Sequence, residues 1–117
     1  YESAVQLAPD AGLIRIAMAH ALTQQPRPSE AQLTEAQRQL TLAQRTERRD
    51  ARIFRLLASI AGRRGETSEA QLYLAEEALL RRDGGTALAY AHRVQAAEAP
   101  GTRLHLRASD IINFIEN

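Results

Sequence analysis

The stretch ARIFRLLASIAGRRGETSEAQLYLAEEALLRRDG, residues 51–84, decides the fold because it consists of two amphipathic segments joined at Gly65. In the first segment the apolar residues recur at spacings of three and four, the period of one face of an α-helix: Phe54, Leu57, Ala58 and Ala61. Gly65-Glu66 interrupts the pattern and Asp83-Gly84 ends the second segment. The stretch therefore predicts a helical hairpin over residues 51–82.

Similar interruptions divide the rest of the chain. Pro9-Asp10, the Pro26-Arg27-Pro28 turn, Arg49-Asp50 and Pro100-Gly101 separate further apolar-periodic segments. The predicted helices lie near 11–25, 29–47, 51–64, 68–82, 85–98 and 103–115. Short turns place consecutive helices antiparallel, so we expect an all-α fold of three hairpins, 11–47, 51–82 and 85–115, which stack to cover their remaining apolar faces.

Composition supports an all-α chain and excludes several other classes. The 117 residues include 22 Ala and 15 Leu, which are strong helix formers, and no Trp. Alanine at contact positions lets helix axes approach closely. The net charge of +1 supplies no field that would attract a nucleic acid, and the absence of Cys excludes disulfides and cysteine zinc sites. No apolar run reaches the roughly 18 residues of a membrane span, so we expect no membrane insertion.

The pentapeptide Ser-Glu-Ala-Gln-Leu occurs twice, at 29–33 and at 68–72, an internal repeat with an offset of 39 residues. Each copy places Ser three residues before Gln, which predicts a capping box at both helix starts. Farther along, Ala36 and Leu40 match Ala70 and Leu74 at a shorter offset of 34. We interpret the difference as a longer helix over 29–47; the alternative is a loop insertion around Pro26-Arg27-Pro28.

The repeat resembles the tetratricopeptide repeat (TPR), a helix-turn-helix unit of about 34 residues. Residues 51–84 fit best, with matching residues at Phe54, Leu57-Ala58, Gly65-Glu66, Ala70 and Leu74 and departures at Ala61 and Glu77. Tyr1, Ala4 and Pro9 match the last third of a preceding unit. The resemblance implies a right-handed solenoid of stacked hairpins, with a remnant helix at 1–8. Residues 1–117 would then form a single domain at the C-terminal end of a longer chain.

A narrower resemblance covers nearly the whole length. The chain is similar to the C-terminal TPR region of bacterial BepA-like zinc metallopeptidases in these pieces: Tyr1-x-x-Ala4-Val5 with Pro9, Leu13-Ile14-Arg15 with Ala19-x-Ala21-Leu22, Gly65-Glu66 with Ala70-x-Leu72-x-x-Ala75-Glu76, Ala91-x-Arg93, and Leu106-Arg107-Ala108-x-Asp110-Ile111-Ile112. In that group a domain with a His-Glu-x-x-His zinc motif precedes the repeats, and the proteins work at the bacterial envelope.

This resemblance implies a non-catalytic module that recruits a substrate or partner for an upstream zinc peptidase, in the periplasm. The chain itself has no His-Glu-x-x-His motif, and His20, His92 and His105 do not share the spacing of metal ligands on one helix. We therefore predict no catalytic, cofactor or metal site and no zinc in this chain. The alternative is a free-standing TPR adaptor or self-associating scaffold, and a cytoplasmic location stays open.

One polar stripe follows the helix predicted at 51–64. Arg52, Arg55, Ser59 and Arg63 share a face away from Phe54 and Leu57. By resemblance to TPR proteins, whose first helices line a concave groove, the peptide-binding set would be Ile16, His20, Gln24, Arg52, Arg55, Ser59 and Arg63. Arginine binds carboxylates by two parallel hydrogen bonds, so an acidic segment or a C-terminus is the expected partner. The alternative is a solvated face balanced by Glu69, Glu76 and Glu77.

Overall fold

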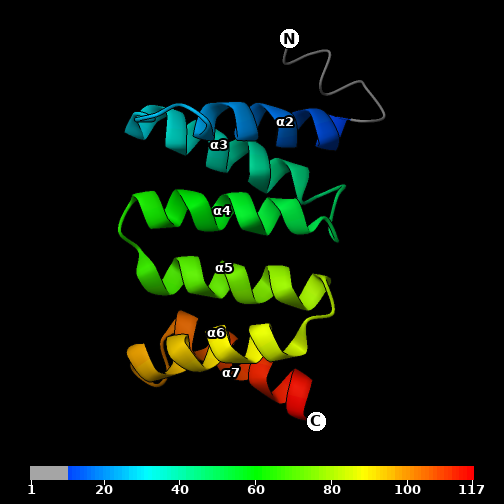
Figure 1. Cartoon of the computed structure of the whole chain (residues 1–117), viewed down its shortest axis with the longest axis vertical. Helices are drawn as coiled ribbons and strands as arrows, with labels where there is room; N and C mark the ends of the chain where they lie inside the picture. Colours follow the sequence, from blue (N-terminus) through cyan, green and yellow to red (C-terminus); the bar gives the residue numbers. More distant parts are fainter. Residues whose placement is uncertain (1–10) are drawn as a thin grey trace.

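The computed structural model describes residues 11–117, and this part of the chain consists of six helices with no strand (Figure 1). The helices are α2 (Ala11–Thr23), α3 (Glu30–Ala43), α4 (Ala51–Arg63), α5 (Thr67–Leu80), α6 (Gly84–Ala97) and α7 (Arg103–Glu116). The predicted all-helical class is confirmed, and every helix predicted between residues 11 and 115 is present. The predicted remnant helix at 1–8 lies outside the described residues.

The length difference between the two repeats lies in the connections. α3 and α5 have 14 residues each, so the interpretation of a longer helix over 29–47 is wrong. The connections 24–29 and 44–50 of the first unit are longer than the matching connections 64–66 and 81–83 of the second. The alternative of a loop insertion at Pro26-Arg27-Pro28 is therefore correct in part, because the 44–50 segment holds extra residues as well.

The two copies of the pentapeptide begin their helices differently. Ser29 is the N-cap of α3: its hydroxyl accepts from the Gln32 N–H at 3.1 Å, and the Gln32 side chain accepts from the Ser29 N–H at 2.8 Å. The box predicted at Ser68 is wrong. Gly65 (φ 76°) closes α4 with a Schellman turn, in which the Glu66 N–H donates to the Ala61 carbonyl at 2.9 Å. Glu66 is thereby the residue before α5, and Ser68 already lies inside its first turn.

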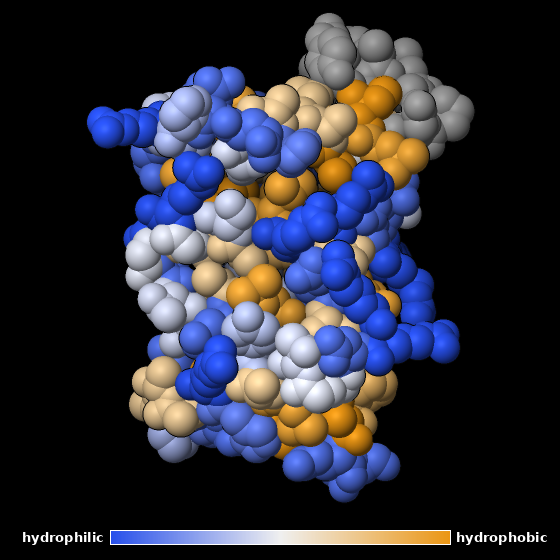
Figure 2. Space-filling model, in the orientation of Figure 1, coloured by the Kyte–Doolittle hydropathy of each residue, from blue (hydrophilic) through white to orange (hydrophobic). Residues whose placement is uncertain are grey.

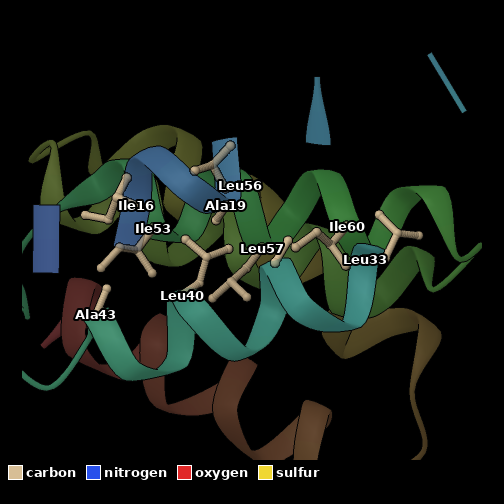
Figure 3. Close-up of a cluster of buried hydrophobic side chains, with 10 residues drawn as sticks. Ile16, Ala19, Leu33, Leu40, Ala43, Ile53, Leu56, Leu57 and Ile60 are labelled. Carbon is tan, nitrogen blue, oxygen red and sulfur yellow. The ribbon is translucent and has the colours of Figure 1, made fainter. Parts of the chain in front are cut away.

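The first hydrophobic core lies between α2, α3 and α4. Its buried residues come from all three helices and include Ile16, Leu40, Ile53 and Ile60, each at most 3% exposed. Figure 3 shows these side chains pointing toward one another between the blue, teal and green helices. α4 turns Ile53, Leu56, Leu57 and Ile60 toward α2 and α3. Of the stripe predicted on residues 51–64, only Leu57 and, at the edge, Phe54 belong to this core, whereas Ala58 and Ala61 are buried outside it.

The second core lies between α5, α6 and α7 and consists largely of alanine. Ala75, Ala87, Ala91 and Ala108 are completely buried, together with the larger Val94. Because Ala has a short side chain, these helices pack at close range. Ile111 and Ile112 of α7 are buried here as well.

The α4–α5 hairpin joins the two cores. The Phe54 ring of α4 lies 6.3 Å from the Tyr73 ring of α5 at an angle of 32°, so Phe54 is part of the contact between the two helices of the best-matched repeat. Phe54 is only half-buried, however, because it packs at the edge of the first core.

The two hairpin-to-hairpin contacts differ in kind. α2 packs beside α4, and α5 packs beside α7, in addition to the contacts between consecutive helices. Within the described chain no Cα of α4 lies within 8 Å of a Cα of α6. The first two hairpins therefore meet through the first helix of each, α2 and α4. The last two hairpins meet instead through the second helix of each, α5 and α7.

Replacing Arg82 by Gly is expected to raise the free energy of unfolding by about 0.5–1 kcal/mol, because Arg82 ends α5 in the left-handed region (φ 60°) that glycine adopts without steric cost. The Asp83 N–H donates to the Ala78 carbonyl at 2.9 Å, the same closing bond as at Gly65. Urea unfolding measures the change. Arg81→Gly is the matched control: Arg81 has a negative φ, so this variant should be less stable than the parent. A destabilised Arg82→Gly would contradict the assigned turn.

Candidate functional site

A cleft runs between α2 and α4, which lie side by side and run in the same direction (Figure 1). It has a volume of about 230 Å³ and is lined by Leu13, Ile16, Ala17, His20, Arg52, Arg55 and Leu56. Figure 2 looks onto this face, where hydrophilic side chains cover part of α4 next to apolar surface of α2. The cleft therefore combines an apolar floor with a basic edge.

Four of the seven predicted site residues meet in this cleft: Ile16, His20, Arg52 and Arg55. The other three lie on or next to the same two helices but outside the lining. Gln24 is exposed and bonds to His20, with 3.1 Å between the Nε2 atoms. Ser59 is exposed on α4, and Arg63 donates from Nη2 to the Thr23 carbonyl at 3.1 Å.

Ile16 belongs mainly to the core. Its side chain is 3% exposed because it packs in the cluster between α2, α3 and α4, so it shapes the cleft floor and offers little surface to a ligand. The accessible apolar surface comes instead from Leu13, which is 46% exposed, and from Ala17 one turn later. Sequence reasoning missed both, although Leu13, Ala17 and His20 share one helical face at spacings of four and three.

Arg52 is already paired. Its Nε and Nη2 donate to Asp50 Oδ1 and Oδ2 at 3.0 and 2.7 Å, and Asp50 also accepts from the Arg52 N–H as the N-cap of α4. The side-chain hydrogen bond from Arg52 lowers the pKa of the Asp50 carboxyl and raises the pKa of Arg52. The charge of Arg52 is therefore neutralised at its own helix start, and Arg52 is a poor candidate for binding a second carboxylate.

Arg55 is the available cation of the cleft. It is exposed, and it makes no hydrogen bond or ion pair with any described residue. Its charge adds only the smallest of the contributions that lower the pKa of Asp50, whose oxygens are held by Arg52. Arg63, two turns along the same face, uses one donor on a carbonyl and keeps its charge. The basic stripe predicted from three arginines is thus reduced to Arg55, supported by Arg63.

The glutamates that were expected to balance this stripe pair elsewhere. Glu69 pairs with Arg103 at 3.0 Å, Glu76 with Arg107 at 2.6 Å and Glu77 with Arg81 at 3.4 Å. The balancing role assigned to them is wrong, because α5 directs them toward α7 and along its own length. No carboxylate of the described chain bonds to the Arg55 guanidinium, so its donors are open to a ligand.

Sequence reasoning also missed a buried polar contact between α2 and α3. Arg15 Nη1 of α2 donates to Gln39 Oε1 of α3 at 2.7 Å, and both side chains are buried. Arg64, at the end of α4, bonds to Gln37 and Thr34 and pairs with Glu30, all on α3. These contacts fix α3 against its neighbours and so hold the two helices that form the cleft.

Between residues 11 and 117, no three His, Asp or Glu side chains are grouped so as to hold a metal ion. No helix in the same range is both long and apolar enough to cross a membrane. Comparisons of the chain with models of protein families, with curated proteins and with solved structures found no match.

Proposed function

We propose that the chain is a non-catalytic module that binds another protein through an acidic segment or a C-terminal carboxylate in the α2–α4 cleft. The observation that carries the proposal is the placement of Arg55 at the edge of an apolar cleft that also contains His20 and the exposed Leu13. Arg55 is exposed and has no hydrogen-bond or ion-pair partner among residues 11–117. A side chain of the bound segment would lie on Leu13 and Ala17, while its carboxylate would accept from Arg55.

We further propose that this arrangement is the first step of a TPR-like right-handed solenoid. The side-by-side placement of α2 and α4 supports it, since first helices of successive TPR units line one groove. Between the second and third hairpins, the contact is between α5 and α7. This change would turn α6, the first helix of the third hairpin, away from α4. The cleft would therefore end at α4, and the bound segment would be short.

On the residue resemblance alone, we propose that the parent protein is a bacterial envelope zinc metallopeptidase, with zinc in an upstream domain and this module recruiting its substrate or partner in the periplasm. The alternative is a free-standing adaptor or self-associating scaffold. The coding sequence upstream of Tyr1 decides between them: a His-Glu-x-x-His motif supports the peptidase, and an upstream sequence without one supports the adaptor.

Arg55→Ala is expected to weaken binding of a short acidic peptide about tenfold, because it removes a charged hydrogen-bond donor worth about 1.4 kcal/mol at this edge. Fluorescence anisotropy with a labelled peptide ending in two glutamates measures the loss. Comparing free and amidated C-termini tells whether side-chain carboxylates suffice. Raising the salt concentration should weaken binding to the parent chain more than to the variant, because exposed charges are screened.

Arg93→Ala is the matched control. Arg93 is also exposed, but it lies on α6 with its guanidinium carbon 5.2 Å from the centre of the Tyr90 ring, and α6 contacts neither α2 nor α4. This variant should bind as the parent does. If the Arg55→Ala and Arg93→Ala variants bound the acidic peptide equally tightly, Arg55 would be an ordinary solvent-exposed residue. The proposal of a binding site in the cleft would then lose its support.

A further inference from the structure

A second groove lies at the opposite end of α4 and α5 from the Gly65 turn, where the two cores meet. It has a volume of about 570 Å³, within the range of roughly 300–1,000 Å³ that is usual for ligand sites. Its residues come from four elements: Arg48 and Arg49 from the 44–50 connection, Phe54 from α4, Glu76, Leu79 and Leu80 from α5, and Arg107, Asp110, Ile111 and Phe114 from α7.

The apolar part of this groove includes the most exposed large hydrophobic side chain of the described chain. Phe114 is 76% exposed, one turn beyond Ile111, which is 1% exposed and anchored in the second core. Phe54 lies on the α4 side and packs against the first core, while Leu79 packs against the second. The groove thus offers apolar surface on three packed helices, with one aromatic ring directed into solvent.

The charge around the groove is uneven. Arg107 and Glu76 neutralise each other through two hydrogen bonds, at 2.8 and 2.6 Å. Arg48 and Arg49 are exposed and make no hydrogen bond or ion pair with any described residue. The 44–50 side of the groove is therefore positive, whereas Asp110 on α7 lies near the paired Arg107 and adds to the raised pKa of that guanidinium.

We propose that this groove binds an amphipathic helix of a partner protein, with large apolar side chains on Phe54, Leu79 and Phe114 and with acidic residues toward Arg48 and Arg49. Burying the Phe114 ring supplies the apolar driving force, and an acidic flank complements the two unpaired arginines. The site is independent of the α2–α4 cleft, since the two grooves share no lining residue.

The probe is a capped helical peptide with Leu and Phe on one face and Glu on the flank of that face. Phe114→Ala is expected to weaken its binding by about 30-fold, as for a central aromatic residue of an interface. Leu106→Ala is the matched control, because Leu106 is 55% exposed on the same helix but lies outside the groove. The double variant Arg48→Ala/Arg49→Ala should weaken binding about tenfold at low salt and little at high salt.

Changes to the peptide test the apolar and the charged contacts separately. A peptide with Ser in place of Leu and Phe should lose binding, and a peptide with Lys in place of Glu should bind less tightly. Phe114→Ala should leave binding of the short acidic peptide unchanged, so failure of the cleft and failure of the groove give different results. Sedimentation velocity shows whether the chain self-associates through Phe114. Absence of probe binding, equal losses for Phe114→Ala and Leu106→Ala, or a dimer abolished by Phe114→Ala would overturn the proposal.

Discussion

Replacing Ile53 by Ala is expected to lower the free energy of unfolding by about 3–4 kcal/mol. Ile53 is 1% exposed and lies among residues of α2, α3 and α4, so the deleted atoms leave a cavity that three packed helices cannot close. Denaturant unfolding measures the loss, and the dependence of the free energy of unfolding on denaturant concentration should stay unchanged. Ile53→Val should cost about 1 kcal/mol, because it deletes a single methylene group.

Arg55→Ala, two residues along the same helix, serves as the control for this prediction. Arg55 is exposed, so its truncation should change the stability by no more than about 0.5 kcal/mol. The same result shows that the binding variant keeps its fold. Similar unfolding midpoints for Ile53→Ala and Arg55→Ala would mean that α4 turns a different face toward α2 and α3.

Replacing Ala91 by Leu is expected to lower the free energy of unfolding by about 3 kcal/mol, at the upper end of the usual cost of overpacking. Ala91 is completely buried on α6 in the core that α6 shares with α5 and α7, so a larger side chain must push the helices apart or adopt a strained rotamer. Thermal and denaturant unfolding both report the loss. This result would show that the alanines of the second core set a close helix-to-helix distance.

Ala96→Leu is the matched control, since Ala96 lies on the exposed face of the same helix. Both variants make the same chemical change within one helix. Ala96→Leu should therefore leave stability within about 0.5 kcal/mol of the parent. If Ala91→Leu were as stable as Ala96→Leu, the second core would have room for a larger side chain at Ala91. That result would contradict close packing of α6 against α5 and α7.

The helices were predictable from sequence because local signals determine them. Apolar spacing marked Leu57 and Ala61 as facing inward, and both are buried, while Gly65 ends α4 where the pattern breaks. The end of α3 was not predictable in this way, because residues 44–47 contain neither Pro nor Gly and are compatible with helix, yet α3 ends at Ala43. Ser68 failed as a cap for a related reason, since the turn at Gly65 fixes where α5 begins.

The candidate cleft was predictable in part. Helical spacing placed Arg52 and Arg55 on one face of residues 51–64, and both line the cleft, but spacing does not show which charges are already paired. The Asp50 cap lies two residues from Arg52, so that pair could have been anticipated from the N-cap position alone. The groove at Phe114 depends on contacts between α5, α7 and the 44–50 connection, which are distant in sequence, and no local pattern indicates it.

The most direct test of the α2–α4 cleft is a titration of isotope-labelled protein with the short acidic peptide, followed by amide chemical shifts. We predict that the largest shifts occur at Leu13, Ala17, His20 and Arg55, and that Arg55→Ala reduces them at the same peptide concentration. Shifts confined to other helices, or equal shifts in the parent and the Arg55→Ala protein, would contradict a carboxylate-binding site in this cleft.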